Sequence, residues 1–512
     1  MDKEKLRCGY IGFLYAIREK EDIRVFDSES SLNCVLITFL QKKKRGIQLL
    51  PESFIPTNHI EAYPPYSNGF PENVSFNIDK MICILSLLSE IPARHKDLID
   101  EDGFVPIHGA TLRNNIKDYR SYLDYLIQTN VILENHYYIV GEKSMSYAWA
   151  EQYMNDRFTS ITTSENTDFF IDEPCDSLMN APYLLHWYNS QKLRIDKEGA
   201  LLYAWRIKQD KIHDRSRWDK NRDTGRLKNP IIQYHAALHN IFSCDALNYR
   251  LHIDSNVHRL HSVLTNMQKN FRNFLTYDNQ QLVSIDIKNC QPYLACAILN
   301  QEFWNPNSIN PFTLYKLHPN IIDRLTLPLL TIMMGKFFSA IQQAELEEFI
   351  QIVSSGRMYE SIMDTVQEQT GNSICRDDAK TAMFSIIFSS NRGNNNSETS
   401  WLRRIYKERF KAVFGLFGII KRDYHNGEEK PHGRLSCLLQ SIESEIVLHR
   451  CCKRIWEERG TDVPFFTIHD SIVTTVGNEE YVSSIMYDEL KKNVGIYPAL
   501  SFEYWGEPAH EH

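Results

Sequence analysis

Residues 282–294, with the sequence LVSIDIKNCQPYL, constrain the fold of this chain more than any other stretch. The β-branched and apolar residues 282–285 predict a buried strand, and Asp286 follows it. Pro292 and the apolar run 293–299 then predict a helix, because proline suits the first position of a helix. This order of strand, loop and helix places one carboxylate on a rigid element, where it can hold a metal ion or cap the helix.

A second β-rich run, residues 463–475, is interrupted by His469, Asp470 and Ser471. Polar side chains in the middle of a buried strand pair are costly unless they find partners, so we expect a hairpin that presents them at its tip. Asp470 could then converge with Asp286 on divalent cations, the arrangement used for in-line displacement at phosphorus. An ordinary polar turn at Asp470 is the alternative interpretation.

Between these segments, two cations and two aromatic residues recur at intervals of four: Arg376, Lys380, Phe384 and Phe388. On an α-helix this spacing places the four side chains along one face, over about 18 Å. Such a face suits a nucleoside triphosphate, with phosphates at the basic end and a base stacked at the aromatic end. A solvated face that merges into the core is the alternative, and the order of the three segments favours the nucleotide.

Together these segments resemble the palm and fingers of family A nucleic-acid polymerases, which include bacterial DNA polymerase I and the single-subunit phage RNA polymerases. Asp286 matches the metal-binding Asp of motif A, the stripe matches the helix of motif B, and His469-Asp470 matches motif C. Further segments match family sequences in the same order, namely residues 259–262, 265–268, 271–275 and 440–446. The resemblance covers residues 256–512 and implies an α+β fold, a right-hand polymerase with palm, fingers and thumb.

The resemblance also implies site residues, a mechanism and partners. Asp286 and Asp470 would hold two Mg²⁺ ions, for which Mn²⁺ can substitute, in template-directed nucleotidyl transfer from nucleoside triphosphates. Lys380 would be catalytic as the proton donor to pyrophosphate and would also bind phosphate. Ile287 would be a further metal ligand. The nucleotide would be bound by Ile287, Gln291, Arg376, Phe384 and Phe388, and the primer-template nucleic acid by Arg259, Arg272, Gln440 and His469.

Three positions depart from the DNA polymerases of the family. Gln291 replaces a Glu that blocks a ribose 2′-hydroxyl, Phe388-Ser389 replaces Tyr-Gly, and Ser471 follows motif C as in phage RNA polymerases. A DNA polymerase without an evident proofreading exonuclease is the favoured interpretation. A phage-type RNA polymerase or primase-like enzyme, and a non-catalytic nucleic-acid-binding protein derived from the palm, are the alternatives.

The composition describes an ordinary globular chain, with 512 residues, 43% of them hydrophobic and 24% charged. The net charge of −8 argues against nucleic-acid binding over the whole surface, although not against a local basic channel. The 11 cysteines include no Cys-x-x-Cys pair, which favours reduced core thiols. No apolar run reaches the roughly 18 residues of a membrane span and no signal peptide is evident, so we expect a cytoplasmic protein without membrane contact.

Four regions are expected along the chain. They are an α/β accessory region (1–77), a winged-helix-like domain (78–156), a linker and thumb-like basic region (157–255) and the catalytic domain (256–512). In the third region, residues 206–228 hold nine Lys or Arg against four Asp. This excess suits contact with a phosphate backbone, and a solvated helix with internal ion pairs is the alternative.

The winged-helix expectation rests on a change of pattern within residues 78–156. Helical periodicity at 81–88 and 112–129 gives way to the strand candidates 131–133, 136–140 and 146–149. Domains of this kind bind DNA through a helix and a wing, or serve as protein-docking units. Without a strongly basic helix, the sequence leaves both partners open.

Overall fold

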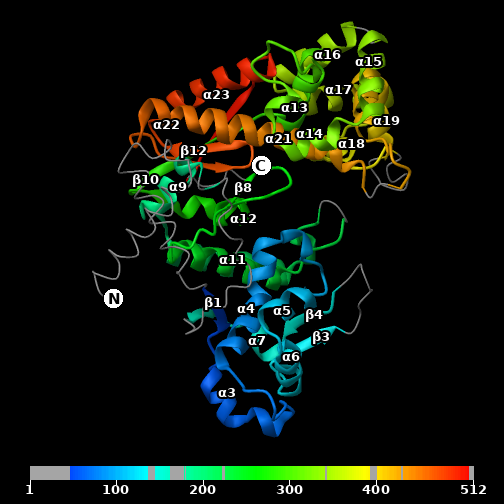
Figure 1. The fold of residues 1–512 in the computed structure, drawn as a ribbon. Helices are drawn as coiled ribbons and strands as arrows, with labels where there is room; N and C mark the ends of the chain where they lie inside the picture. The colour runs from blue at the N-terminus through cyan, green and yellow to red at the C-terminus, as the bar shows by residue number, and fades with distance from the viewer. Residues whose placement is uncertain are drawn as a thin grey trace, which may run out of the picture.

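The computed structural model describes residues 47–135, 144–161, 178, 180–221, 225–340, 343–391, 400–427 and 430–506. Helices and antiparallel sheets both occur, in agreement with the α+β expectation, and Figure 1 shows their arrangement. The strand expected at 136–140 and the turn after it lie outside the described residues. None of the helices in the described part of the chain combines the length and the apolar character that a membrane span requires.

The N-terminal part consists of short helices around two small sheets. Its elements are β1 (Gln48–Pro51), α3 (Pro56–Ala62), α4 (Ile78–Arg94), β2 (Val105–Pro106), α5 (Gly109–Asn115), α6 (Tyr119–Gln128), β3 (Ile132–Asn135), β4 (Ser146–Trp149), α7 (Glu151–Met154) and β5 (Phe158–Ile161). β1 pairs with β5, and the second sheet has the order β2-β4-β3. The strand expected at 146–149 is confirmed, and the helix expected at 81–88 lies within α4.

The single helix expected over residues 112–129 is wrong, because the structure divides it into α5 and α6. Ile116 adopts an extended conformation, with φ of −127°, and its side chain is buried. The buried side chain of Ile116 anchors the turn that ends α5. Asp118 is the residue before α6, so the second helix begins at Tyr119. Helical periodicity continues across the break, so no local pattern in the sequence marks it.

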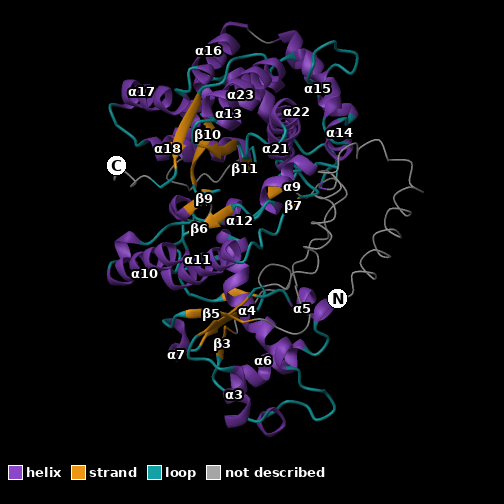
Figure 2. Ribbon diagram, turned by 90° about the vertical axis from the view of Figure 1, so that its left-hand side faces the viewer, coloured by secondary structure: helices purple, strands orange, loops and turns teal. Residues whose placement is uncertain are grey.

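The middle region connects the N-terminal part to a larger sheet. Its elements are α9 (Pro182–Asn189), β6 (Leu193–Ile195), α10 (Lys197–His213) and α11 (Pro230–Asp245). α11 packs against both α4 and α10, and Figure 2 shows α10 and α11 between the large sheet and the N-terminal helices. The β1–β5 pair crosses the expected boundaries at 77 and 156, and the pairing of β6 with β9 crosses the one at 255. Segments on the two sides of each expected boundary are therefore in contact, and the division into four regions stays a prediction.

The large sheet is built around β10 (Gln280–Ile287), which contains the strand expected from the sequence. β10 pairs with β12 (Ser471–Thr475) and with β13 (Leu500–Tyr504), and β12 also pairs with β11 (Phe465–Ile468). β9 (Leu275–Tyr277) joins β10 through a two-residue turn, in which Asp278 and Asn279 have positive φ values of 51° and 61°. Asp and Asn tolerate this conformation, which matches the twist of a hairpin. The hairpin expected over 463–475 is confirmed.

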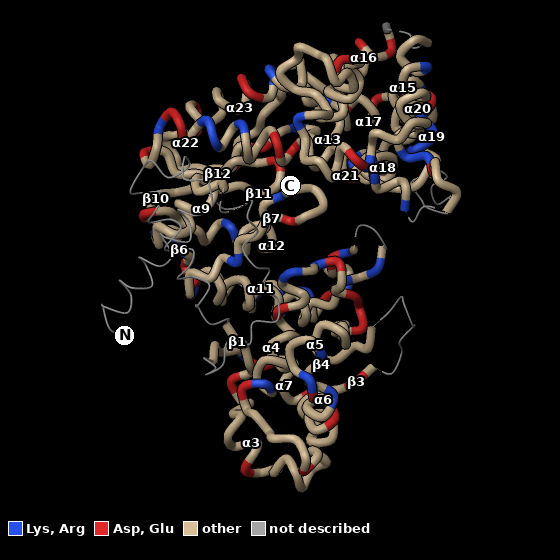
Figure 3. The backbone as a smooth tube through the Cα atoms, in the orientation of Figure 1, with Lys and Arg blue, Asp and Glu red and all other residues tan. Residues whose placement is uncertain are grey.

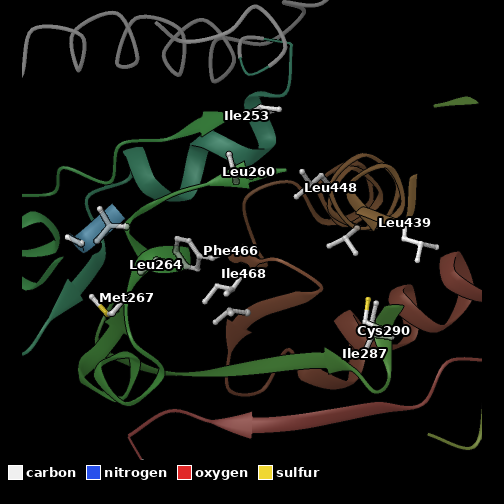
Figure 4. Packing of buried hydrophobic residues seen from close by; sticks show 14 of the residues in the cluster. Ile253, Leu260, Leu264, Met267, Ile287, Cys290, Leu439, Leu448, Phe466 and Ile468 are labelled. Atoms are coloured by element: carbon white, nitrogen blue, oxygen red, sulfur yellow. The ribbon is translucent and has the colours of Figure 1, made fainter. Parts of the chain in front are cut away.

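Apolar side chains fix the sheet against the helices that cover it. α13 (Cys290–Ile298) begins two residues before Pro292, so this proline lies at the third helical position rather than the first. α13 packs with α21 (Gly433–Ile446) and α23 (Glu479–Val494), and α23 also contacts β10 and β12. Figure 4 shows Ile287, Leu439, Phe466 and Ile468 in this core. Each such buried side chain contributes about 1.5–3 kcal/mol through the apolar surface removed from water.

A helical lobe occupies the sequence between β10 and α21. It consists of α14 (Pro319–Leu325), α15 (Pro328–Ala340), α16 (Gln343–Ser354), α17 (Met358–Thr370), α18 (Arg376–Phe388), α19 (Ser400–Arg409) and α20 (Lys411–Ile420). α18 packs against α17, α19 and α21, so it lies where the lobe meets the sheet-containing part. Figure 1 shows this lobe at the end of the molecule opposite α3 and α6.

One glycine fixes the contact between this lobe and the ends of the sheet strands. Gly356 lies in the turn between α16 and α17, with φ of +73°. A Cβ atom there would lie 2.7 Å from the Cβ atom of Ala499 and 3.1 Å from the Cδ atom of Lys288. The main-chain N–H of Lys288 donates to the carbonyl of Ala499 at 2.8 Å, so the backbone in front of Gly356 is itself held in place.

We therefore expect Gly356→Ala to lower the free energy of unfolding by about 3 kcal/mol, through backbone strain and steric overlap together. Gly371→Ala is the matched control, because Gly371 has the same φ of +73° and an added methyl group there would meet no atom within 4 Å. The control should cost only about 1 kcal/mol. Denaturant unfolding of both variants measures the difference, and equal losses would show that the close approach to Ala499 is unimportant.

Candidate functional site

The two candidate metal-binding carboxylates lie side by side. In the pairing of β10 with β12, Asp286 is opposite Ser471. His469 and Asp470 form the two-residue turn between β11 and β12, and Ser471 is the first residue of β12. His469 has a positive φ of 55°. Neighbouring strands are about 4.8 Å apart, so the register brings the two Asp residues to the same end of the sheet. Both side chains are half-buried and therefore still reached by solvent.

The surroundings raise the pKa of both carboxyl groups above the ordinary range of Asp. For Asp286 the largest cause is burial, followed by repulsion from Asp470. For Asp470 burial is again the largest cause, followed by repulsion from Glu443. Two adjacent carboxylates with too little compensating charge destabilise the fold at neutral pH, and a bound cation would remove that cost.

The donor set fits Mg²⁺, which prefers carboxylate oxygens and is commonly held by one or two of them together with substrate phosphates. Among the described residues, no group of three or more His, Cys, Asp or Glu side chains is arranged as a metal site. The expected ligand Ile287 has a buried side chain and is paired with Leu500, so only its main chain can take part.

Glu443 is a third acid beside this pair, and the sequence reasoning did not single it out. It lies on α21 and is buried, and burial raises the pKa of its carboxyl group. Its Oε2 atom accepts a hydrogen bond from Nη2 of Arg259 at 2.6 Å and another from Nε2 of Gln291 at 2.8 Å. Glu443 lies in the segment 440–446, one of the segments with a family resemblance. An acidic residue among the apolar residues of a helix was the sequence feature that could have indicated its role. Gln440, one turn earlier on α21, is half-buried.

Both partners of Glu443 are residues that the sequence assigned to the site. We expected Arg259 to contact nucleic acid and Gln291 to contact the nucleotide; the structure shows both bonded to Glu443, and their roles toward substrates stay predictions. Around them, several buried polar atoms have no hydrogen-bond partner among the described residues: Nε of Arg259, Oε1 of Gln291, Oε1 of Glu443, and Oδ1 and Nδ2 of Asn289. Unsatisfied buried polar atoms are uncommon in proteins, and these five belong to Glu443, to its two partners and to Asn289 in the loop after β10.

Two cations, Arg272 and Lys96, lie near one another, and Arg272 also interacts with Asp286. Burial lowers the pKa of the Arg272 guanidinium. Lys96, which follows α4, donates to the carbonyl of Met267 at 3.1 Å. Burial and the charges of Arg272 and Lys228 lower the pKa of Lys96 to about 8. No sequence pattern connects Lys96 with this site, because about 190 residues separate it from Asp286.

His469 faces the same group of cations. Protein packed around the ring and the charges of Arg259, His261, Arg272 and Lys96 lower the pKa of His469, although the outer surface of this side chain is exposed. Contact of His469 with a nucleic-acid strand stays a prediction.

The basic and aromatic stripe lies on one helix, as expected. α18 begins at Arg376 and ends at Phe388, and all four stripe residues are half-buried or exposed. Nζ of Lys380 lies 5.8 Å from the centre of the Phe384 ring, and the rings of Phe384 and Phe388 are 5.6 Å apart. Arg376 donates through Nε to Glu360 at 2.8 Å.

Tyr359 connects the stripe to the carboxylates. The guanidinium of Arg376 lies 4.9 Å from the centre of its ring. Tyr359 is buried, and burial raises the pKa of its hydroxyl, with further contributions from Cys290 and Asp470. These interactions place Tyr359 between the basic end of α18 and Asp470. The structure therefore brings Arg376 to the same side of the molecule as the two Asp residues.

The basic segment 206–228 is largely engaged within the protein. Lys211 pairs with Asp219 at 2.6 Å, and Arg215 pairs with Glu101 at 2.8 Å. Lys208 is buried, with its Nζ atom 3.7 Å from the Trp205 ring centre. For these cations the alternative of an ion-paired or packed helix describes the structure better than a free phosphate-binding surface.

No family model and no curated protein matches the chain. Solved structures do match, among them the POL domain of Pol1 from M. smegmatis in complex with DNA primer-template and dNTP. The match has 13% sequence identity and a TM-score of 0.31, and it covers 64% of this chain and 70% of that chain. A similarity of this size does not define a common fold.

We expect Asp286→Asn and Asp470→Asn each to raise the free energy of unfolding in the absence of divalent cations, by on the order of 1 kcal/mol at pH 7. The sign follows from the raised pKa values: the folded state disfavours the ionised form, so ionisation costs stability above the folded-state pKa and costs nothing at pH 3. Thermal unfolding at pH 7 and pH 3 measures the effect. Asp488→Asn, at an exposed helix position, is the control and should change stability little at either pH.

Removing one partner of the Arg259–Glu443 ion pair should be costly, because the other charge stays buried alone. We expect Arg259→Met to destabilise the protein by about 3 kcal/mol and the double variant Arg259→Met/Glu443→Gln to recover much of that loss. Denaturant unfolding of the two single variants and the double variant gives the coupling energy. Additive effects would show that the pair does not stabilise the site.

Proposed function

We propose that this protein is a template-directed nucleotidyltransferase, most simply a DNA polymerase of the family A type. The observation that carries the proposal is the position of Asp286 and Asp470 at one end of the β10–β12 pair, with Tyr359 linking them to Arg376 on α18. Paired carboxylates beside a phosphate-binding cation are the requirements of phosphoryl-group chemistry, in which most of the catalysis is positioning and charge stabilisation.

Asp286 and Asp470 would hold two Mg²⁺ ions, with the main chain of Ile287 as a further ligand. When bound, such ions lower the pKa of the primer 3′-hydroxyl and offset charge that develops at the α-phosphate. The half-exposed position of the carboxylates leaves them accessible to a substrate, and their raised pKa values explain why a cation would bind there strongly.

Arg376 and Lys380 would bind the β- and γ-phosphates of the incoming nucleotide, and Lys380 would donate a proton to the departing pyrophosphate. Phe384 and Phe388 would pack against the sugar and the base. The rings follow Lys380 along the exposed side of α18, in the order that a nucleotide lying along the helix requires. The ion pair with Glu360 would keep the Arg376 side chain extended toward Tyr359.

The primer-template strand would lie against the cations near the carboxylates. Arg272 lies within charge–charge range of Asp286, Lys96 and His469 lie near Arg272, and Gln440 lies half-exposed on α21. Arg259 would act indirectly, by holding Glu443 and through it Gln291 in place. Contacts of Lys and Arg with phosphates supply most of the sequence-independent affinity of such enzymes for nucleic acid.

The N-terminal part would be an accessory module that binds DNA or a protein. Its element order from α4 to β4, with a sheet of order β2-β4-β3, is typical of winged-helix domains and supports this proposal. On α6, Arg120 pairs with Asp124 and Glu134. A helix whose cation is engaged in this way is better suited to docking a protein than to reading a DNA groove.

An RNA polymerase is the second candidate, and the position of Gln291 favours it. The amide of Gln291 is turned toward Glu443 and is buried, so it does not project as a barrier to a ribose 2′-hydroxyl. The choice of sugar is therefore a question that the same assay must answer.

Extension of a labelled primer on DNA and RNA templates tests the proposal, with Mg²⁺ and with dNTPs and rNTPs supplied separately. We expect Asp470→Asn to lower the rate by about 1000-fold or more, which corresponds to about 4 kcal/mol of lost transition-state stabilisation. Asp488→Asn is the matched control and should extend primers at the normal rate.

A folded Asp470→Asn variant that retains normal extension would contradict the assignment of the metal site. If neither sugar were incorporated by the unaltered protein, with or without a primer, while the protein still bound nucleic acid, the proposal of a polymerase would fail and a non-catalytic binding protein would replace it.

A further inference from the structure

A pocket of about 260 Å³ lies where the C-terminal end of α18 meets α19 and α20. It is lined by Ile386, Asn391, Arg403, Lys407, Lys411, Phe414, Gly415, Phe417, Gly418 and Lys421. Four of these residues are Lys or Arg, and no acidic residue is among them. Figure 3 shows the concentration of basic positions on α19. The pocket is at the end of α18 opposite Arg376, about 18 Å along the helix.

Three of the cations already have a structural task. Nζ of Lys421 donates to the main-chain carbonyls of Ser389, at 2.8 Å, and Ile386. Nη2 of Arg403 donates to the carbonyl of Ser390 at 2.6 Å, and Lys407 reaches the carbonyl of the next residue at 3.5 Å. They satisfy the carbonyl groups that the end of α18 leaves without partners. Capping of the helix therefore explains why some positive charge is here.

Capping does not explain how much positive charge is here. The end of a helix carries about half a negative charge, whereas four Lys or Arg side chains line this pocket. Burial and the charges of Arg403 and Lys407 lower the pKa of Lys421 to about 7, and burial and Arg403 lower the pKa of Lys407 as well. These like charges are held close together, and among the described residues that line the pocket they meet main-chain carbonyls but no carboxylate.

Arg403 also has unused hydrogen-bonding capacity. Its residue surface is only 8% exposed, and its Nε atom is buried without a hydrogen-bond partner among the described residues. A buried guanidinium N–H normally finds an acceptor, because leaving it unpaired is costly. Lys411, by contrast, is exposed at the edge of the pocket, where its amine can reach an incoming group.

We propose that this pocket binds a phosphate group, supplied either by a nucleic-acid strand or by a free nucleoside di- or triphosphate. The guanidinium of Arg403 and the ammonium groups of Lys407 and Lys411 match a tetrahedral dianion, and phosphate is an anion that Arg and Lys commonly bind in this way. The volume fits a phosphate or pyrophosphate group better than a whole drug-sized ligand. The inference does not depend on the proposed catalysis, because it concerns a different end of α18.

Calorimetric titration with pyrophosphate, without divalent cations, tests the inference. The full chain carries Arg376→Ala and Lys380→Ala, which removes the other expected phosphate site. In this background we expect pyrophosphate to bind and to raise the melting temperature. Adding Lys407→Gln and Lys411→Gln should weaken binding by at least about 10-fold. Arg404→Gln is the matched control on the same helix: Arg404 is exposed and does not line the pocket, so binding should be unchanged.

Competition identifies the source of the phosphate. Displacement of pyrophosphate by a dNTP, and not by single-stranded DNA, would assign the pocket to free nucleotides. Displacement by single-stranded DNA, with an affinity that falls steeply as salt rises, would assign it to a strand. If the folded Lys407→Gln/Lys411→Gln protein bound pyrophosphate as tightly as the Arg404→Gln control, or if no binding occurred in the starting background, the inference would be wrong.

Discussion

The pairing of β10 with β12 is the constraint on which the rest of this structure depends. Its register sets Asp286 opposite Ser471 and therefore beside Asp470. Two neighbouring carboxylates are unfavourable in a folded protein, and here burial and mutual repulsion raise both of their pKa values. Selection for stability alone would not retain this pair of carboxylates. The apolar core beneath the sheet supplies the stability that allows it, and the carboxylates are available for a cation.

Polar groups lie on two sides of Asp286 and Asp470, and both carboxylates remain accessible to a substrate. Glu443 accepts hydrogen bonds from Arg259 and Gln291, so Gln291 is tied to a buried ion pair. On the other side, Arg272 and Lys96 supply positive charge from different parts of the chain. One side of the site is thus a fixed network, and the other is a cationic surface suited to a phosphate backbone.

Much of the framework could be predicted from the sequence, because short-range patterns determine it. The strand before Asp286, the hairpin around Asp470 and the helix Arg376–Phe388 all follow from local periodicity. What the sequence did not reveal depends on distant partners: Glu443 and Lys96 became part of the site only through tertiary packing. For the same reason, segment 206–228 had the charge of a nucleic-acid surface, and only the structure shows that two of its described cations, Lys211 and Arg215, pair with acids.

The central claim is that Asp286 and Asp470 hold divalent cations together with a nucleotide. Binding of Mn²⁺, followed by electron paramagnetic resonance with and without a nucleoside triphosphate, tests it most directly. The account predicts that the nucleotide strengthens Mn²⁺ binding in the unaltered protein, and that Asp286→Asn and Asp470→Asn each abolish this effect while the protein stays folded. Mn²⁺ binding that neither substitution changes would contradict it.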